Sequence, residues 1–384
     1  PAATAPTAFA ARLAGDDRRT RFVVDLTESV EFGVFPLDEP RRIVVDLPET
    51  RFALAPDAGN EGRGVVAAWR YGLLAAGKSR IVIDLAGPAA VDKAFVLPPI
   101  DDQPARLVID LVATNPTAFA EDVQRARKAR SAVAEGGAAP APVSRSGRVR
   151  PLIVLDPGHG GIDTGAIGVD GVREKTLTLE FAKLLQQKLA DTGLFDVRLT
   201  RDDDVFVSLG DRVAFARSAA ADLFVSIHAD AAPQDFVRGA TVYTVSEKAS
   251  DAQAAAIAAQ ENRSDVIAGV DLPDTSDVVT DILIDLARRE TKTLSHRAAE
   301  ALIGELGETV MLNNNPHRSA GFRVLRAHDV PSVLVELGYM TNRHDEALML
   351  TQEWREKAAS AVVVALRRFF APRIAGGTAV PPPE

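Results

Sequence analysis

The chain has 384 residues, of which 46% are hydrophobic and 25% charged, and its net charge is −9. This composition excludes a disordered or fibrous protein, and no apolar run approaches the roughly 20 residues that span a bilayer. The acidic balance argues against nucleic acid as the main ligand, because such binding depends on phosphate neutralisation by Lys and Arg. Cysteine is absent, which excludes disulfides and thiolate metal sites and is compatible with the bacterial periplasm.

The first third of the chain contains a repeated hexamer. Each copy begins with Arg, ends with Asp-Leu and has an apolar centre; the copies are residues 21–26, 42–47, 80–85 and 106–111. Such runs are typical of strands packed on one face. The copies fall in two pairs, which predicts a duplicated half-domain in which each half forms one antiparallel sheet and the two sheets stack. No His, Ser or Cys cluster accompanies the strands, so we expect residues 1–115 to be a binding module.

A connecting region and a tail flank the second domain. Residues 116–149 are predicted to form a short amphipathic helix over 116–130, followed by a flexible linker rich in Gly, Ala and Pro. Residues 373–384 end in a Pro-rich polar stretch and are predicted to be a flexible tail.

Strands and helices alternate between residues 150 and 372. Apolar strands are predicted near residues 152–155, 197–200, 223–227 and 333–337, with helices over 177–189 and 209–220. This alternation predicts an open, twisted, mostly parallel α/β sheet with helices on both faces. In such sheets, ligand sites lie beyond the carboxyl ends of the strands.

Three potential metal ligands lie close to those strand ends. His159 lies in a glycine-rich turn after the first strand, Glu174 begins the next helix, and His228 ends a strand. Two imidazoles and one carboxylate form a catalytic zinc set that leaves one coordination position open. We therefore predict one zinc ion, although this spacing is not a compact metal motif and ordinary strand-end histidines are the alternative. Asp156 and Asp163 flank the turn and are candidates either to orient the ligands or to cap it.

Four segments in this region resemble, in order, the motifs of the zinc-dependent type 3 family of N-acetylmuramoyl-L-alanine amidases. They are residues 153–168, 173–175, 226–230 and 330–342. The repeated N-terminal strands resemble the AMIN domain that precedes this catalytic domain in periplasmic cell-division amidases. The resemblance implies a peptidoglycan hydrolase that cuts the amide between N-acetylmuramic acid and the L-alanine of the stem peptide. It also implies that the AMIN-like domain targets the protein to the wall or septum.

The resemblance also implies roles for single residues. His159, Glu174 and His228 correspond to the zinc ligands, and Glu336 corresponds to the catalytic carboxylate. Glu336 is the one carboxylate in an otherwise apolar strand, where desolvation should raise its pKa toward that of a general base. Arg323 is a candidate for a contact with the substrate.

The segment between His228 and Glu336 is longer than one strand–helix unit needs. Residues 247–300 carry much of the excess and are predicted to form two helices, over 250–270 and 275–301. In the division amidases that this chain resembles, an inserted helix covers the site and a glutamate takes the open zinc position. We predict that Glu261 is this glutamate (the plug), with Glu290 as the second candidate. The alternative is that the inserted segments are ordinary surface helices with solvated charges.

We expect a periplasmic enzyme at the division septum, and peptidoglycan as its substrate. The resemblance implies a LytM-type activator, which opens the site only if it binds the opened form more tightly than the closed form. The chain begins at Pro1 without a leader, as a mature exported protein or a trimmed chain would. Two alternatives remain, namely another zinc peptidase or deacetylase acting on the cell wall, and a wall-binding scaffold with an inactive site.

Overall fold

The computed structural model describes residues 5–55, 58–134, 148–232, 234–270 and 282–376. These residues divide into two compact units. The first unit contains the described residues before 140 together with 161–163 and 265–270, and the second contains the rest. Among the described residues, no helix is both long and apolar enough to cross a lipid bilayer.

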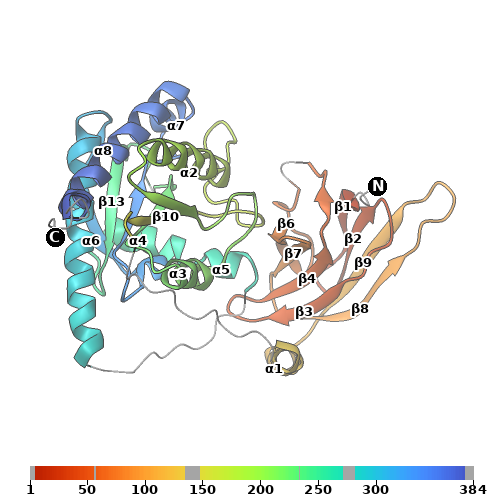
Figure 1. The fold of residues 1–384 in the computed structure, drawn as a ribbon. Helices are drawn as coiled ribbons and strands as arrows, with labels where there is room; N and C mark the ends of the chain where they lie inside the picture. The colour runs from red at the N-terminus through yellow and green to blue at the C-terminus, as the bar shows by residue number, and fades with distance from the viewer. Residues whose placement is uncertain (1–4, 56–57, 135–147, 233, 271–281, 377–384) are drawn as a thin grey trace. The chain divides into compact units, whose positions relative to one another are not determined.

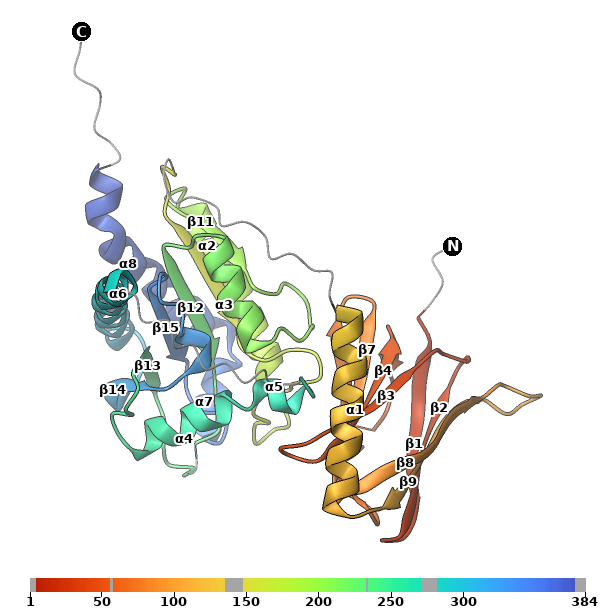
Figure 2. The ribbon, with the colours of Figure 1, turned by 90° about the horizontal axis from the view of Figure 1, so that it is seen from below.

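The first unit is a β-sandwich of two sheets followed by helix α1 (Pro116–Ala134). One sheet has the strand order β5-β1-β2-β9-β8 and the other has the order β3-β4-β7-β6. Figure 2 shows β3, β4 and β7 in one layer and β1, β2, β8 and β9 in the other. The strands are β1 Thr7–Gly15, β2 Arg19–Leu26, β3 Gly33–Leu37, β4 Arg42–Pro48, β5 Arg51–Phe52, β6 Val66–Ala75, β7 Lys78–Leu85, β8 Ala89–Leu97 and β9 Ala105–Ala113.

The four hexamers lie on strands β2, β4, β7 and β9, but they do not pair as predicted. Strand β2 pairs with β9 and β4 pairs with β7, so the prediction of one sheet per half is wrong. Antiparallel pairing sets the Arg of one copy opposite the Asp of the other. Arg21 donates to Asp110 at 2.7 and 2.8 Å, and Arg80 donates to Asp46 at 2.6 and 2.9 Å. This match of Arg with Asp occurs whenever two copies pair antiparallel, so the hexamer sequence does not determine which copies pair.

The second unit is built on a six-stranded sheet in the order β11-β10-β12-β15-β13-β14. Strands β11, β10, β12 and β15 run parallel, whereas β13 runs antiparallel to β15. The predicted open, mostly parallel sheet is therefore confirmed, although β13 and β14 were not predicted. The strands are β10 Leu152–Pro157, β11 Asp196–Leu199, β12 Leu223–His228, β13 Ala240–Val245, β14 Leu312–Ala320 and β15 Ser332–Glu336.

Helices cover both faces of this sheet, as predicted. Ile153 and Leu155 of β10 pack in one core with α2, α6 and α8, whereas Leu152 and Val154 pack in another with α3 and α4. Figure 1 shows α2 and α3 on opposite sides of the sheet. The helices of the second unit are α2 Glu174–Asp191, α3 Leu209–Ser218, α4 Ala252–Glu261, α6 Ile282–Gly307, the 3₁₀ turn η1 Arg323–Leu325, α7 Arg343–Met349 and α8 Gln352–Gly376. The short helix α5 is Ser264–Ile267, of which residues 265–267 belong to the first unit.

Two predicted boundaries differ from the structure. The linker predicted from residue 131 begins inside α1, and residues 135–147 lie outside the described residues. The tail predicted from residue 373 begins inside α8, which continues to Gly376. Two contacts hold this end of the helix: Phe370 is buried, and Arg373 forms an ion pair of 2.5 Å with Asp222. Residues 377–384 lie outside the described residues.

The described residues of the inserted region form three helices rather than the two predicted. Helices α4 and α5 occupy the first predicted span, and α6 continues beyond the predicted end of the second span to Gly307. Residues 271–281 lie outside the described residues.

Candidate metal centre and active site

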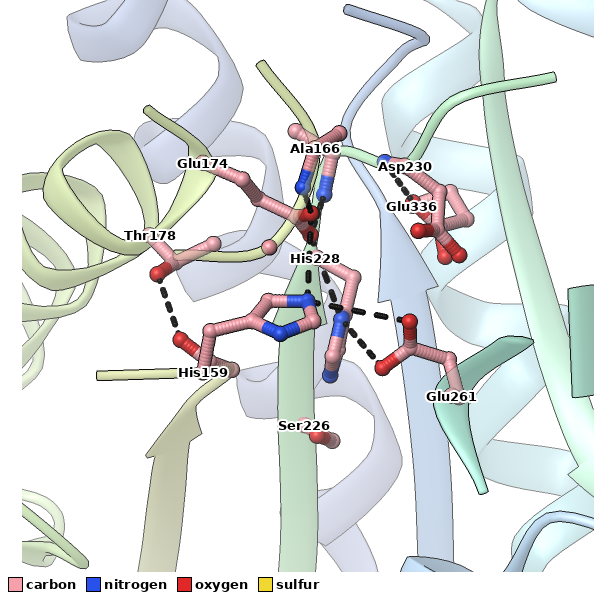
Figure 3. A network of polar contacts seen from close by, with 12 residues as sticks. His159, Ala166, Glu174, Thr178, Ser226, His228, Asp230, Glu261 and Glu336 are labelled. Atoms are coloured by element: carbon pink, nitrogen blue, oxygen red, sulfur yellow. Dashed lines mark hydrogen bonds and ion pairs between the residues drawn. The ribbon is translucent and has the colours of Figure 1, made fainter. Parts of the chain in front are cut away.

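The ends of two strands and the start of one helix bring His159, Glu174 and His228 together (Figure 3). His228 ends β12, Glu174 begins α2, and His159 follows β10. Glu174 Oε2 lies 3.1 Å from His159 Nε2, and Glu174 Oε1 lies 3.2 Å from His228 Nδ1. All three residues are buried. The predicted ligands therefore share one buried site.

This donor set fits a zinc ion. Ligand atoms around a tetrahedral zinc lie about 3.3 Å apart, given bonds of about 2.0 Å, and the two distances above are close to that value. The electrostatics also favour a cation. Burial alone would lower the pKa of His228, but Glu261 and Glu174 outweigh burial and raise this pKa to about 10.

Two glycines leave room for the ligands. A Cβ atom at Gly158 would lie 2.4 Å from His228 Cε1, and one at Gly165 would lie 2.6 Å from Glu174 Oε2 and His159 Cδ2. His159 itself has a φ of 60°, in the left-handed region. A turn rich in glycine is needed here because larger residues would collide with the ligands.

Backbone amides orient the Glu174 carboxylate. The N–H of Ala166 donates to Oε2 and the N–H of Ala229 donates to Oε1, each at 2.8 Å. Burial alone would raise the pKa of Glu174, but His159 and His228 outweigh it and lower this pKa well below its ordinary value. The lowered pKa favours the ionised carboxylate, which is the form that could bind a metal ion.

Two buried arginines that sequence analysis missed hold the His159 turn. Arg212 donates to Asp156 Oδ1 at 2.7 Å and to the carbonyl oxygen of His159 at 2.7 Å. Arg201 donates to the carbonyl oxygen of Gly158 at 2.8 Å. Asp156 thus fixes the turn through Arg212 and is not brought into the ligand set.

The sequence carried one signal for Arg212. Its position on α3 matches the spacing of the buried residues Leu209 and Ala216, so it points inward. A charged residue at an inward position needs a buried partner. Asp163, the other candidate beside the turn, is also buried.

Glu336 lies beside the ligands at the end of β15. It is paired in register with His228 on the neighbouring parallel strand and is fully buried. Its Oε2 accepts a hydrogen bond of 2.9 Å from the N–H of Asp230, while Oε1 has no hydrogen-bond partner among the described residues. Burial raises the pKa of Glu336 to about 8, against the attraction of His228. A carboxylate with a pKa in this range can both accept and return a proton.

Glu261 reaches the same histidines from the end of α4. Its Oε2 lies 3.0 Å from His228 Nδ1 and its Oε1 lies 3.7 Å from His159 Nε2 (Figure 3). The residue is only 3% exposed. Of the two plug candidates, the structure sets Glu261 beside the histidines and leaves Glu290 exposed on α6.

The residues on either side of Glu261 also form hydrogen bonds in and near the site. Gln260 donates from Nε2 to Asp230 Oδ1 at 2.7 Å. Asn262 donates to the carbonyl oxygen of Gly321 at 3.0 Å and accepts from the N–H of Arg323 at 2.7 Å. Arg323, the predicted substrate contact, has an exposed side chain and joins this network through its backbone.

The fold and the site define a class of protein. An open α/β sheet carries, at the carboxyl ends of its strands, a His–Glu–His set beside a buried carboxylate. Such a set could hold a metal ion next to a proton-accepting carboxylate, a combination typical of metal-dependent hydrolases.

Comparisons with known proteins specify the family. The family model described as N-acetylmuramoyl-L-alanine amidase matches residues 153–368, and the AMIN domain model matches residues 10–111. The chain is 33% identical over 388 residues to the N-acetylmuramoyl-L-alanine amidase AmiC of Neisseria meningitidis serogroup B, covering 95% of this chain and 90% of that protein. It is 32% identical over 366 residues to AmiC of Escherichia coli O6:H1, covering 92% and 87%. The chain therefore belongs to the N-acetylmuramoyl-L-alanine amidase family, with an AMIN domain before the catalytic domain.

A solved structure also matches part of the chain. The N-acetylmuramoyl-L-alanine amidase AmiC2 of Nostoc punctiforme matches with a TM-score of 0.41 and 26% identity, covering 58% of this chain and 97% of that one.

Proposed function

We propose that this chain is a zinc-dependent amidase that hydrolyses the bond between N-acetylmuramic acid and the L-alanine of the stem peptide in peptidoglycan. Family membership supports this class of substrate. The observation that carries the mechanism is the convergence of His159, Glu174 and His228 beside Glu336, all of them buried.

The chain's own residues supply the ligands and the proton transfer. Zinc held by His159, Glu174 and His228 would act as a Lewis acid for the substrate carbonyl and would lower the pKa of water at the site. Glu336 takes a proton from the attacking water through its unpaired Oε1. The same oxygen then returns the proton to the amine as the C–N bond breaks, so that no net proton is gained or lost.

The proposal includes autoinhibition by Glu261. Its carboxylate approaches both imidazoles and competes there with water and with the substrate carbonyl. Turnover therefore requires α4 to move. An activator of the LytM type would achieve this by binding the displaced form more tightly, and shifting the ratio from 1:99 to 99:1 requires about 5.5 kcal/mol of differential binding.

We further propose that the enzyme acts in the periplasm at the division septum. The match to the AMIN domain model over residues 10–111 supports this proposal, and we propose that this domain serves as the targeting module.

The test is to identify, by mass spectrometry, the products that the Glu261→Ala protein releases from purified peptidoglycan, with and without a zinc chelator. We expect intact stem peptides with a free L-alanine amine, and no release in the presence of the chelator. Shortened stem peptides would instead indicate a peptidase, and free amino groups on the glycan would indicate a deacetylase. Either product set, or undiminished release with the chelator, would contradict the proposal.

A further inference from the structure

Asp230 lies in the site but has no role in the mechanism above. It is fully buried, and its N–H donates to Glu336 at 2.9 Å. Its Oδ2 has no hydrogen-bond partner within the described part of the chain. A buried carboxylate oxygen without a partner is costly, so its presence calls for a functional reason.

The side chain that contacts Asp230 comes from the inhibitory helix. Gln260 donates from its carboxamide N–H to Asp230 Oδ1 at 2.7 Å, while Glu261, the next residue, extends carboxylate oxygens to the two histidines. The end of α4 thus presents an amide N–H at Asp230 and an oxygen at the histidines. These are the two polar atoms that the scissile bond of an amidase substrate also carries.

The spacing of these positions suits one amide group. Single ligand atoms of His159, Asp230 and Glu261 all lie within 4.8 Å of one another. The oxygen and nitrogen of an amide are about 2.3 Å apart, and a hydrogen bond adds about 2.9 Å. An amide whose oxygen takes the position of the Glu261 carboxylate can therefore direct its N–H to Asp230.

We propose that Asp230 binds the N–H of the scissile amide in the active enzyme, and that Gln260 occupies this position when the site is closed. The inference rests on the proposed amidase function. In the closed site, the end of α4 would then block two positions. Glu261 takes the position of the substrate carbonyl oxygen, and Gln260 takes the position of the substrate N–H. It also holds the leaving nitrogen next to Glu336, which Figure 3 shows beside Asp230.

The test compares two soluble probes that differ at one atom. The first is N-acetylmuramoyl-L-alanyl-D-isoglutamine, and the second is its ester analogue with L-lactate in place of L-alanine, which lacks the N–H. Binding is measured by calorimetry to full-length, zinc-loaded protein carrying Gln260→Ala, Glu261→Ala and Glu336→Gln, which removes both blocking contacts and prevents turnover. We expect this protein to bind the amide about 10- to 100-fold more tightly than the ester, because the ester offers no N–H and leaves a buried acceptor oxygen of Asp230 without a donor.

Adding Asp230→Leu should reduce this preference to less than about twofold. The weaker carbonyl of the ester affects both proteins alike, so the difference between them isolates the N–H contact. The same preference with and without Asp230, or no preference when Asp230 is present, would overturn the proposal.

Asp230→Asn is the conservative variant and guards against a folding defect. It keeps a carbonyl oxygen that can accept the N–H, so an intermediate preference is expected, and complete loss of preference in a folded, zinc-loaded protein would also overturn the proposal. These binding results do not depend on turnover. Failure of the Glu261→Ala protein to release stem peptides would contradict the proposed function and leave the binding test intact.

Discussion

The two sides of the active site are held in different ways. On the ligand side, the buried pair of Arg212 and Asp156 fixes the His159 turn, and two backbone amides fix Glu174. On the other side, Glu261 and its two neighbours make their contacts from the end of one helix. Removing Arg212 or Asp156 would leave its partner as an unpaired buried charge. By contrast, the contacts of Glu261 and its two neighbours can all be broken together when the end of α4 moves away. The ligand side should therefore persist when α4 moves.

The core contacts of α4 support this difference. The buried apolar residues of the helix are Ala254, Ile257 and Ala258, so only one of them is a large side chain. By contrast, α2 buries Leu177, Phe181, Leu185 and Leu189. Because hydrophobic stabilisation scales with the apolar area buried, displacing α4 should cost less than displacing α2.

The largest effect is expected from removing the base on the ligand side. Glu336→Gln keeps the size of the side chain but removes its ability to accept a proton, and should lower the rate of stem-peptide release by about 10²- to 10⁴-fold. The zinc content should not change. The control is Glu353→Gln, because Glu353 is exposed on α8. Undiminished release by the Glu336→Gln protein would show that another group is the base.

The next largest effect is expected from replacing Arg212, which holds the His159 turn. Arg212→Met leaves Asp156 as an unpaired buried charge and should lower the free energy of unfolding by about 3–5 kcal/mol, as measured by denaturant titration. Arg217→Met is the matched control on the same helix, since Arg217 forms a largely exposed pair with Asp329 and should contribute less than about 1 kcal/mol. Equal losses in the two variants would contradict the proposed rigidity of the ligand side.

On the helix side, removing the plug should raise activity rather than lower it. Glu261→Ala eliminates the carboxylate at the histidines and should increase stem-peptide release without an activator by about 10- to 100-fold. Glu290→Ala is the matched control in the same inserted region, and no change is expected there. A folded, zinc-loaded Glu261→Ala protein with unchanged basal release would exclude autoinhibition by this residue.

A smaller increase in basal stem-peptide release is expected from replacing Asn262, the residue after Glu261. Asn262→Ala removes the hydrogen bonds to the Gly321 carbonyl and the Arg323 N–H, which should raise basal release by about 2- to 10-fold while Glu261 remains. Asn314→Ala, at an exposed position, is the control. If Asn262→Ala lowers release instead, its contacts support the active form and not the closed one.

The sequence located the residues of the ligand side because its signals are local. An apolar strand followed by a glycine-rich turn locates His159, and a strand end locates His228. The proximity of Glu336 to His228 depends on the pairing of β12 with β15, which no local pattern encodes. The family resemblance supplied this role. The contacts of Gln260 and Asn262 were not predicted, because they depend on where α4 lies on the sheet.

Strand pairing was the hardest feature to predict. In the first unit, the Arg and Asp of each hexamer match any antiparallel copy, so only the chain connections decide between partners. In the second unit, β14 is an edge strand rich in Asn, with a Pro and a His. Edge strands do not require an apolar pattern, so this one carried no strand signal.

The most direct test of the account is the zinc content of full-length protein, measured by elemental analysis after dialysis. The unaltered protein and the Glu261→Ala variant should each hold one zinc per chain, because the plug is not needed to retain the metal. His228→Ala should hold none. A full complement of zinc in folded His228→Ala protein, or no zinc in the unaltered protein while it still releases stem peptides, would contradict the metal site proposed here.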